Sequence, residues 1–399
     1  MTNKPQFVGE RVRLGKLLLD TFSGEWGTEE GESLTPVLRT SNFNEDGSLD
    51  YSTPAIRCIP ERKVAKKRMF RGDIILEKSG GTPKRPVGIM AFYDSDELAL
   101  CSNFNQVLRF DEDLILSRFA FHQLRWLKDR NAFDRFTRKT TGLQNLQMKK
   151  LIELKLHVPQ IEAQTTIADT LDKIVDNQRT LQREIIDLDF LVKSRFVEMF
   201  GDPCDPGSSS AKSRIDSFCE LRIGPFGSAL HKEDYITDGH PLVNPSHIIG
   251  GAIRLDENLT IDDGKYESLA AYHLLPGDVV LGRRGEIGRC AVVKTDGLIC
   301  GTGSMIIRPG QKVRSDYLQR VVSFPSFSHA LEANAVGVTM KNLNAKIVGS
   351  AEVFLPDLKD QDTFISFVSQ IDKSRFIAQQ QIEKLQMLYD SLAQEYFGD

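Results

Sequence analysis

The chain has 399 residues, of which 40% are hydrophobic, so it can bury two or three cores of ordinary domain size. Its formal charge of −4 and pI near 6.1 exclude nucleic-acid binding through overall positive charge, and any such role must rest on local basic clusters. Six cysteines without a CxxC pair, no signal peptide and no apolar run of membrane-spanning length predict a cytoplasmic protein.

Residues 1–158 are predicted to form a first mixed α/β globule. The segments "GDIIL" (72–76) and "QVLRF" (106–110) are short runs bounded by Gly or Asp, which is typical of strands. Residues 114–130 have helical spacing of apolar residues. The densest basic cluster of the chain, "ERKVAKKRMFRG" (61–72), immediately precedes the first of these strands.

Residues 159–202 are predicted to form a long helix with a coiled-coil seam. Apolar residues recur with a 3.5-residue period, which requires a partner helix. Gln178 and Arg195 interrupt the pattern, and Gly201-Asp202-Pro203 ends it. The predicted seam consists of Ile167, Leu171, Ile174, Leu181, Ile185, Leu188 and Val192. An ordinary core-facing helix would be shorter and carry a wider apolar stripe.

Residues 203–355 repeat the pattern of the first globule, and residues 356–399 repeat the helix. The strand-like runs here are "GDVVL" (277–281), "CAVVK" (290–294) and "SMIIRP" (304–309), and residues 315–324 have helical spacing. The second helix keeps the same heptad phase, with Arg375 where the first has Gln178. Its predicted seam residues are Val368, Ile371, Ile382, Leu385, Tyr389 and Leu392.

The chain consists of two tandem copies of one sequence unit. An offset of 197 residues superimposes the segment 143–202 on 340–399 without a gap, and pairs Pro159 with Pro356 and Gln164 with Gln361. A fixed repeat indicates that each copy is one structural module. The predicted fold is α+β: two mixed α/β globules separated by two long helices that form an intramolecular antiparallel coiled coil. This arrangement would place the globules at opposite ends of the helices.

The two helix sequences, "VPQIEAQTTIADTLDKIVDNQ" (158–178) and "LPDLKDQDTFISFVSQIDKSR" (355–375), together with "GDVVLGRRGEIGRCAVV" (277–293), resemble the DNA specificity subunit of type I restriction-modification systems. The resemblance covers essentially the whole chain. It implies two target recognition domains, each reading one half of a split double-stranded DNA site, and helices that act as spacer and docking surface. It also implies that methylation and cleavage belong to other subunits, namely two methyltransferase subunits and the restriction/translocase subunits.

Basic loops in both globules are the predicted DNA contacts. Phosphate contact requires Lys and Arg, while base reading requires a few bidentate side chains. The alternative is that such runs are solvated surface. The predicted DNA-binding residues are Lys63, Lys66, Lys67, Arg68, Lys78, Lys84, Arg85, Arg138, Lys139, Asn145, Arg283, Arg284, Arg289, Lys341, Asn342 and Asn344.

The sequence predicts no catalytic residue, metal site or cofactor. It contains neither an adenine-methyltransferase motif nor a GxxxxGK[ST] phosphate loop, and its seven histidines show no HxxxH or HExxH pairing. The alternative hypotheses are a coiled-coil protein-interaction scaffold without DNA specificity and an enzyme with unrecognised chemistry in one of the globules. Two interpretations of Gln178 and Arg375 also stay open, since one polar residue in an apolar seam can fix register or can mark the edge of a partner's docking site.

Overall fold

A computed structural model describes residues 9–31, 33–83, 85–139, 142–204, 212–225, 229–285, 287–335 and 342–398. The chain forms two compact units. Unit 1 comprises Met1–Arg183 and Ala378–Asp399, and unit 2 comprises Glu184–Ile377. Each unit therefore combines one predicted globule with part of each long helix.

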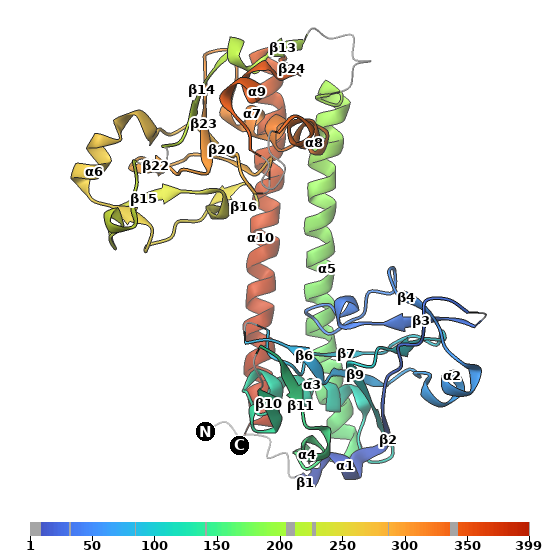
Figure 1. Ribbon diagram of the computed structural model, residues 1–399. Coiled ribbons are helices and arrows are strands. Elements are labelled where there is room, and N and C mark those ends of the chain that lie inside the picture. The colour runs from blue at the N-terminus through green and yellow to red at the C-terminus, as the bar shows by residue number, and fades with distance from the viewer. Residues whose placement is uncertain are drawn as a thin grey trace. The chain divides into compact units, whose positions relative to one another are not determined.

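Unit 1 is built around an antiparallel four-stranded sheet in the order β2-β9-β5-β7 (Figure 1). Its strands are β2 (Leu18–Ser23), β9 (Asn105–Phe110), β5 (Ile74–Glu77) and β7 (Met90–Phe92). The smaller sheets are β4 (Ala55–Cys58)-β3 (Leu34–Leu38)-β8 (Leu100–Cys101), β10 (Thr137–Lys139)-β11 (Gln144–Leu146)-β6 (Ser79–Gly81), and β1 (Glu10–Arg13)-β12 (Lys155–Val158). The short helices are α1 (Leu14–Leu17), α2 (Glu61–Lys67), α3 (Ser117–Asp129) and α4 (Met148–Leu151).

Unit 2 repeats this plan. Its central sheet has the order β14-β23-β20-β21, with β14 (Cys219–Ile223), β23 (Ser304–Pro309), β20 (Val279–Gly282) and β21 (Cys290–Val292). The smaller sheets are β18 (Thr260–Ile261)-β15 (His240–Val243)-β22 (Leu298–Cys300)-β19 (His273–Leu274), β16 (Ile248–Ile249)-β17 (Ala252–Ile253), and β13 (Lys212–Arg214)-β24 (Glu352–Phe354). The helices are α6 (Asp263–Ser268), α7 (Ser315–Val322), α8 (Pro325–Asn334) and α9 (Ala345–Ser350). The predicted strands and helices of both globules are confirmed.

The first three residues of β5 and of β20 are apolar because both faces of these inner strands are buried. In β5, Ile74 and Leu76 contribute to one core cluster while Ile75 contributes to another. In β20, Val279 and Leu281 contribute to one cluster and Val280 to a second. Successive side chains of a strand point to opposite faces, so a sheet covered on both sides requires such a continuous apolar run.

An identical ion pair anchors the central strand in each unit. Asp73 lies just before β5 and is almost fully buried. Its carboxylate accepts hydrogen bonds from Nε and Nη2 of Arg109, at 2.8 and 2.7 Å. Asp278 is placed in the same way before β20 and accepts the same two nitrogens of Arg308, both at 2.8 Å. Bidentate geometry of this kind is what allows a carboxylate to remain buried as a charged group.

The long helices are α5 (Ile161–Phe200) and α10 (Leu358–Phe397) (Figure 1). Within unit 1, Leu171 and Ile174 of α5 share a core cluster with Tyr389 of α10. Within unit 2, Val192 of α5 shares a cluster with Val368 of α10. The start of each helix thus packs near the end of the other, and the predicted antiparallel pairing of an α+β fold is confirmed.

All thirteen predicted seam residues are buried or half-buried. Ile167, Leu171, Ile174, Val192, Val368 and Tyr389 are buried, whereas Leu181, Ile185, Leu188, Ile371, Ile382, Leu385 and Leu392 are half-buried. The heptad pattern missed several deeply buried helix residues, among them Phe196, Phe200, Ala393 and Phe397. They lie beside the seam, where the globule covers a second side of the helix and widens the apolar stripe.

The two polar seam positions bond across the helix pair in equivalent ways. Gln178 Nε2 donates to Gln386 Oε1 at 3.1 Å within unit 1, and Arg375 contacts Asp189 Oδ1 at 3.2 Å within unit 2. The offset of 197 relates Gln178 to Arg375 and Asp189 to Gln386. Both contacts favour the register interpretation of these residues.

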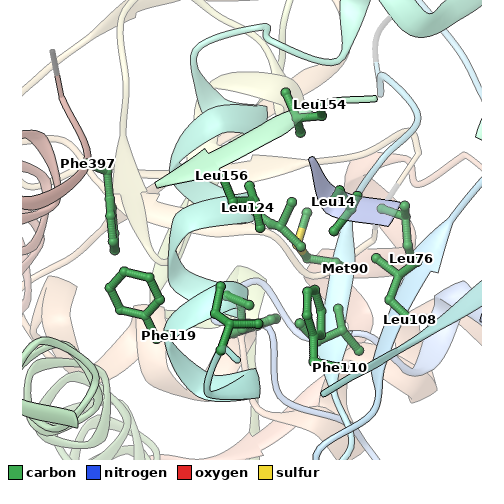
Figure 2. Close-up of a cluster of buried hydrophobic side chains, with 14 of the residues drawn as sticks. Leu14, Leu76, Met90, Leu108, Phe110, Phe119, Leu124, Leu154, Leu156 and Phe397 are labelled. Atoms are coloured by element: carbon green, nitrogen blue, oxygen red, sulfur yellow. The ribbon is translucent and has the colours of Figure 1, made fainter. Parts of the chain in front are cut away.

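The core of unit 1 is completed by the end of α10. Phe397 lies against the ring of Phe119 at the edge of a cluster formed by the sheet and α3, with ring centroids 5.5 Å apart (Figure 2). In unit 2, Phe200 of α5 has the same position against Tyr317, at 5.3 Å. Gly201 then adopts φ +73°, the left-handed conformation that commonly ends a helix. The described residues contain no helix with the length and hydropathy required to cross a membrane.

Candidate nucleic-acid interface

In unit 1 the structure gathers several predicted contacts around the end of β5. Lys78 follows this strand directly, and its Nζ donates to Ser23 Oγ and, at 3.3 Å, to Gln106 Oε1. Both acceptors are uncharged, and within the described part of the chain no carboxylate forms an ion pair with Lys78. Burial lowers the pKa of Lys78. Because a desolvated cation without a counter-ion is unfavourable, this site favours an approaching anion.

Lys63 and Lys67 approach the same place from α2. Lys67 Nζ donates to Gly24 O at 3.2 Å, one residue from the Ser23 hydroxyl that Lys78 contacts. Both lysines also contact Glu25 Oε2, at 3.2 Å for Lys63 and 3.1 Å for Lys67. A single carboxylate therefore faces two ammonium groups, and the cluster keeps excess positive charge.

The sheet β10-β11-β6 adds Arg138, Lys139 and Asn145. Asn145 on β11 is the register partner of Arg138 on one side and of Ser79 on the other. Leu146 N donates to Lys78 O at 2.8 Å, which fixes β11 beside the end of β5. Arg138 is exposed, and Lys139 lies 3.7 Å from Asp134, a distance at which an exposed pair contributes little.

Arg85 is held by a buried carboxylate. Glu77, the last residue of β5, is 2% exposed and contacts Arg85 Nη1 through Oε1 at 3.2 Å. Its Oε2 is buried without a hydrogen-bond partner, and burial raises the pKa of Glu77. About half of the Arg85 side chain is exposed, so Glu77 fixes one side of the guanidinium while the other faces solvent.

Two further predicted contacts of this unit are placed less favourably. The Arg68 guanidinium lies 4.9 Å from the Phe70 ring, and the Arg68 carbonyl accepts from Arg109, near the opposite end of β5. Lys66 is exposed on α2. Lys84 lies outside the described residues.

In unit 2 a buried arginine occupies the position of Lys78. Arg283 directly follows β20 and is only 3% exposed. Its Nε and Nη2 donate to Thr302 O at 3.2 and 3.1 Å, and its Nη1 donates to Asn342 Oδ1 at 3.0 Å. Burial lowers the pKa of Arg283. Leu343 N donates to Arg283 O at 3.0 Å, as Leu146 N does to Lys78 O in unit 1.

The remaining contacts predicted in unit 2 differ in their surroundings. Arg284 is exposed and forms a β-bridge with Asn342, so these two residues are neighbours. Arg289 lines a cavity of about 500 Å³ together with Phe196 and Phe364 of the long helices. The Asn344 side chain accepts from Ile347 N at 2.9 Å and thereby caps α9, a structural role that its position before a helix indicates. Lys341 lies outside the described residues.

No cluster of three or more His, Cys, Asp or Glu side chains that could hold a metal occurs among the residues described. The cysteines have free thiols, and burial raises the pKa of both Cys101 and Cys290 to about 12, far from the range of reactive thiolates. The Lys, Arg and Asn side chains around Lys78 and Arg283 are of the types that contact phosphates and base edges.

The chain is similar to known proteins in sequence and in fold. The family model of the type I restriction modification DNA specificity domain matches residues 32–188 and again residues 210–387. A Methanocaldococcus jannaschii protein described as a type I restriction enzyme MjaX specificity subunit is 20% identical over 370 residues, which cover 88% of this chain and 83% of that protein. The fold resembles a chain from a structure on the complex assembly and conformational transition of a type I R-M system, with a TM-score of 0.57 and 16% identity over the whole of both chains. It also resembles the crystal structure of a type I restriction-modification S subunit from M. genitalium, with a TM-score of 0.56 and 16% identity over 100% of this chain and 98% of the other.

Proposed function

Because the chain belongs to the family of type I restriction-modification DNA specificity subunits, in which sequence recognition is a non-catalytic task, we propose that its two units each read one half of a split double-stranded DNA target. Unit 1 reads through the loops around Lys78, and unit 2 reads through those around Arg283. The two long helices set the spacing of the half-sites.

The observation that carries this proposal is the equivalent placement of Lys78 and Arg283. Both directly follow the central strand, both have a lowered pKa because of burial, and both contact uncharged acceptors. A desolvated cation is unfavourable in a domain that binds no anion. Both copies of this diverged repeat nevertheless have one at the same position. DNA phosphates supply that anion, and the release of their counter-ions favours binding.

The loops around these cations differ between the units, which favours an asymmetric target. Unit 1 presents Asn145, Arg138 and the Glu77-bound Arg85. Unit 2 has glycine, Gly282, where unit 1 has Glu77, and it presents Arg284 beside Asn342. Arginine suits guanine and asparagine suits adenine in the major groove, so different sets of side chains specify different half-sites.

Methyltransferase subunits, two per chain, are proposed to dock on the long helices. In unit 2, Ile186, Phe190 and Val197 of α5 are 65%, 70% and 46% exposed and lie on one side of the helix at spacings of four and seven residues. Exposed apolar side chains grouped on one side of a helix are typical of an interaction surface. The restriction/translocase subunits would join the same complex, in the cytoplasm, where the free cysteines stay reduced.

The test is to map methylated adenines in the genome of a host with and without this gene. The proposal predicts a split motif that disappears when the gene is deleted and returns with the wild-type gene. Exchanging residues 9–158 for those of a family member with a different target should then change one half of the motif only. A motif that is continuous, or that survives the deletion, would contradict the proposal.

A further inference from the structure

Phe104 stands exposed among the cations of unit 1. Phe104 is 54% exposed and lies in the turn that joins β8 to β9. The Phe104 carbonyl accepts from Lys78 N at 3.0 Å and from Ser79 N at 3.2 Å. The backbone is therefore fixed against the start of the candidate DNA-contacting loop, while the 54% exposed Phe104 belongs to neither core cluster of this part of the unit.

Unit 2 makes the same backbone contact without an aromatic ring. The carbonyl of Gly303 accepts from Arg283 N at 3.0 Å, just as that of Phe104 accepts from Lys78 N. The fold therefore does not require a side chain at this position. A single exposed apolar residue is ordinary on a protein surface. Phe104 differs in its place, because its backbone is bonded to Lys78 at the candidate DNA-contacting loop, where a partner that binds the cations would cover it in the first unit alone.

The neighbours of Phe104 indicate the kind of partner. Lys78 lies next to it, Lys67 reaches the adjacent Gly24, and Asn145 pairs with Ser79. A ring framed by cations and an amide matches the groove of a duplex, where phosphates flank base edges. There the C5-methyl group of thymine is the apolar feature that can be read. A protein surface covering the same ring would have to neutralise Lys78 as well.

We propose that Phe104 is a specificity-determining residue that packs against the C5-methyl group of a thymine in the major groove of one half-site. This inference rests on the proposed function, because it assumes that unit 1 reads DNA. Phe104 recognises the methyl group of the T·A pair, while the polar side chains beside it contact hydrogen-bonding edges and phosphates. The reader in unit 2, with Gly303, has no such contact.

The test is a double-mutant cycle between the side chain and the methyl group. The native methyltransferase complex and its Phe104→Ala variant are titrated with duplexes that carry the split motif mapped for the native complex. In further duplexes each fixed thymine of either half is replaced by deoxyuridine, which lacks only the methyl group. Leu114→Ala is the matched control, since Leu114 is a 46% exposed apolar residue of the same unit beside α5.

Phe104→Ala is expected to weaken binding of the thymine duplex by roughly fourfold, the effect of one buried methyl-sized group. One thymine, in one half-site only, should differ from the rest. When deoxyuridine replaces that thymine, the native complex and the Phe104→Ala variant should bind the duplex with equal affinity. Three outcomes would overturn the inference. The first is that the affinity losses from Phe104→Ala and from deoxyuridine add independently at every thymine. The others are a motif without a fixed T·A pair, and a loss of affinity in Leu114→Ala equal to that in Phe104→Ala. In each of these cases the native complex still recognises a split motif, whereas failure of the proposed function would leave no such motif to test.

Discussion

Gln164 and Gln361 make the same three hydrogen bonds in the two units. Gln164 Nε2 donates to Pro159 O at 2.8 Å and to Leu114 O at 3.3 Å, and its Oε1 accepts from Leu116 N at 2.8 Å. Gln361 contacts Pro356 O, Lys312 O and Arg314 N at 2.8, 3.1 and 2.8 Å. Both glutamines are fully buried. Each one joins the first turn of a long helix to the loop before α3 or α7, so this junction is a conserved structural feature of the repeat.

Replacing either glutamine by leucine should destabilise its unit. Gln164→Leu leaves Leu114 O, Pro159 O and Leu116 N without a partner, and unsatisfied buried polar groups cost about 1–3 kcal/mol each. Urea unfolding of the full chain should show the loss, and Gln361→Leu should match it. Gln160→Leu, at an exposed position four residues earlier, is the control and should change the unfolding free energy little.

The stability of unit 1 should fall in mild acid because of His122. This buried ring joins Asp172 Oδ1 and Tyr389 Oη, both at 2.8 Å, and when neutral it donates from Nε2 to the carboxylate and accepts at Nδ1 from the hydroxyl. Burial lowers the pKa of His122 below the ordinary 6.5. Between pH 6.5 and that lower value the unfolded chain binds a proton that the folded chain does not, so stability decreases as pH falls.

Calorimetric unfolding between pH 7.5 and 5 should measure this effect. One proton contributes at most about 1.4 kcal/mol per pH unit to the slope of the unfolding free energy against pH. His122→Gln retains a donor and an acceptor but cannot titrate, so its unfolding should depend less on pH. His329→Gln, at an exposed position of α8, should behave like the native chain. Equal slopes for His122→Gln and the native chain would rule out this assignment.

Removing the half-buried Lys78 and the buried Arg283 should change the salt dependence of DNA binding. If Lys78 and Arg283 each neutralise one phosphate, Lys78→Gln or Arg283→Gln should reduce the slope of log affinity against log salt by about 0.9, and the double variant by about 1.8. Fluorescence anisotropy of the methyltransferase complex on its target duplex at several salt concentrations measures the slope. Lys16→Gln, an exposed change on α1, is the control. An unchanged slope would remove both residues from the interface.

The exposed stripe on α5 should control complex assembly. Phe190→Ser should weaken binding of the methyltransferase subunits at least roughly tenfold, as expected for a large apolar anchor. Arg375→Leu separates docking from register, because Arg375 bonds to Asp189 across the helix pair. Analytical ultracentrifugation of the mixed subunits should show assembly lost for Phe190→Ser and retained for Arg375→Leu. Loss of assembly in Arg375→Leu would instead place that residue at the docking surface.

The repeat made the architecture predictable from sequence, because one offset aligned both globules and both helices. Gln164 and Gln361 were found by that offset, yet their shared role depends on carbonyl groups about fifty residues earlier in the chain. The contribution of Phe196 and Phe397 was missed because a heptad describes only the contact between helices, whereas the globules bury a second side. The pairing of Lys63 and Lys67 with Glu25 also could not be predicted, since it joins residues brought together only by the tertiary fold.

The placement of Phe397 also bears on how the protein folds during synthesis. Unit 2 is one continuous stretch, whereas unit 1 takes its last helical turns from residues made after all of unit 2. During synthesis the first part of unit 1 is therefore made without the helix residues that complete its core. Nearly two hundred further residues, from Arg183 to Ala378, must be synthesised before those residues follow. Contacts so distant in sequence form slowly, and exposed apolar surface promotes aggregation in the interval. A chaperone, or early capture by another subunit, would therefore be most valuable to the half of the molecule that is translated first.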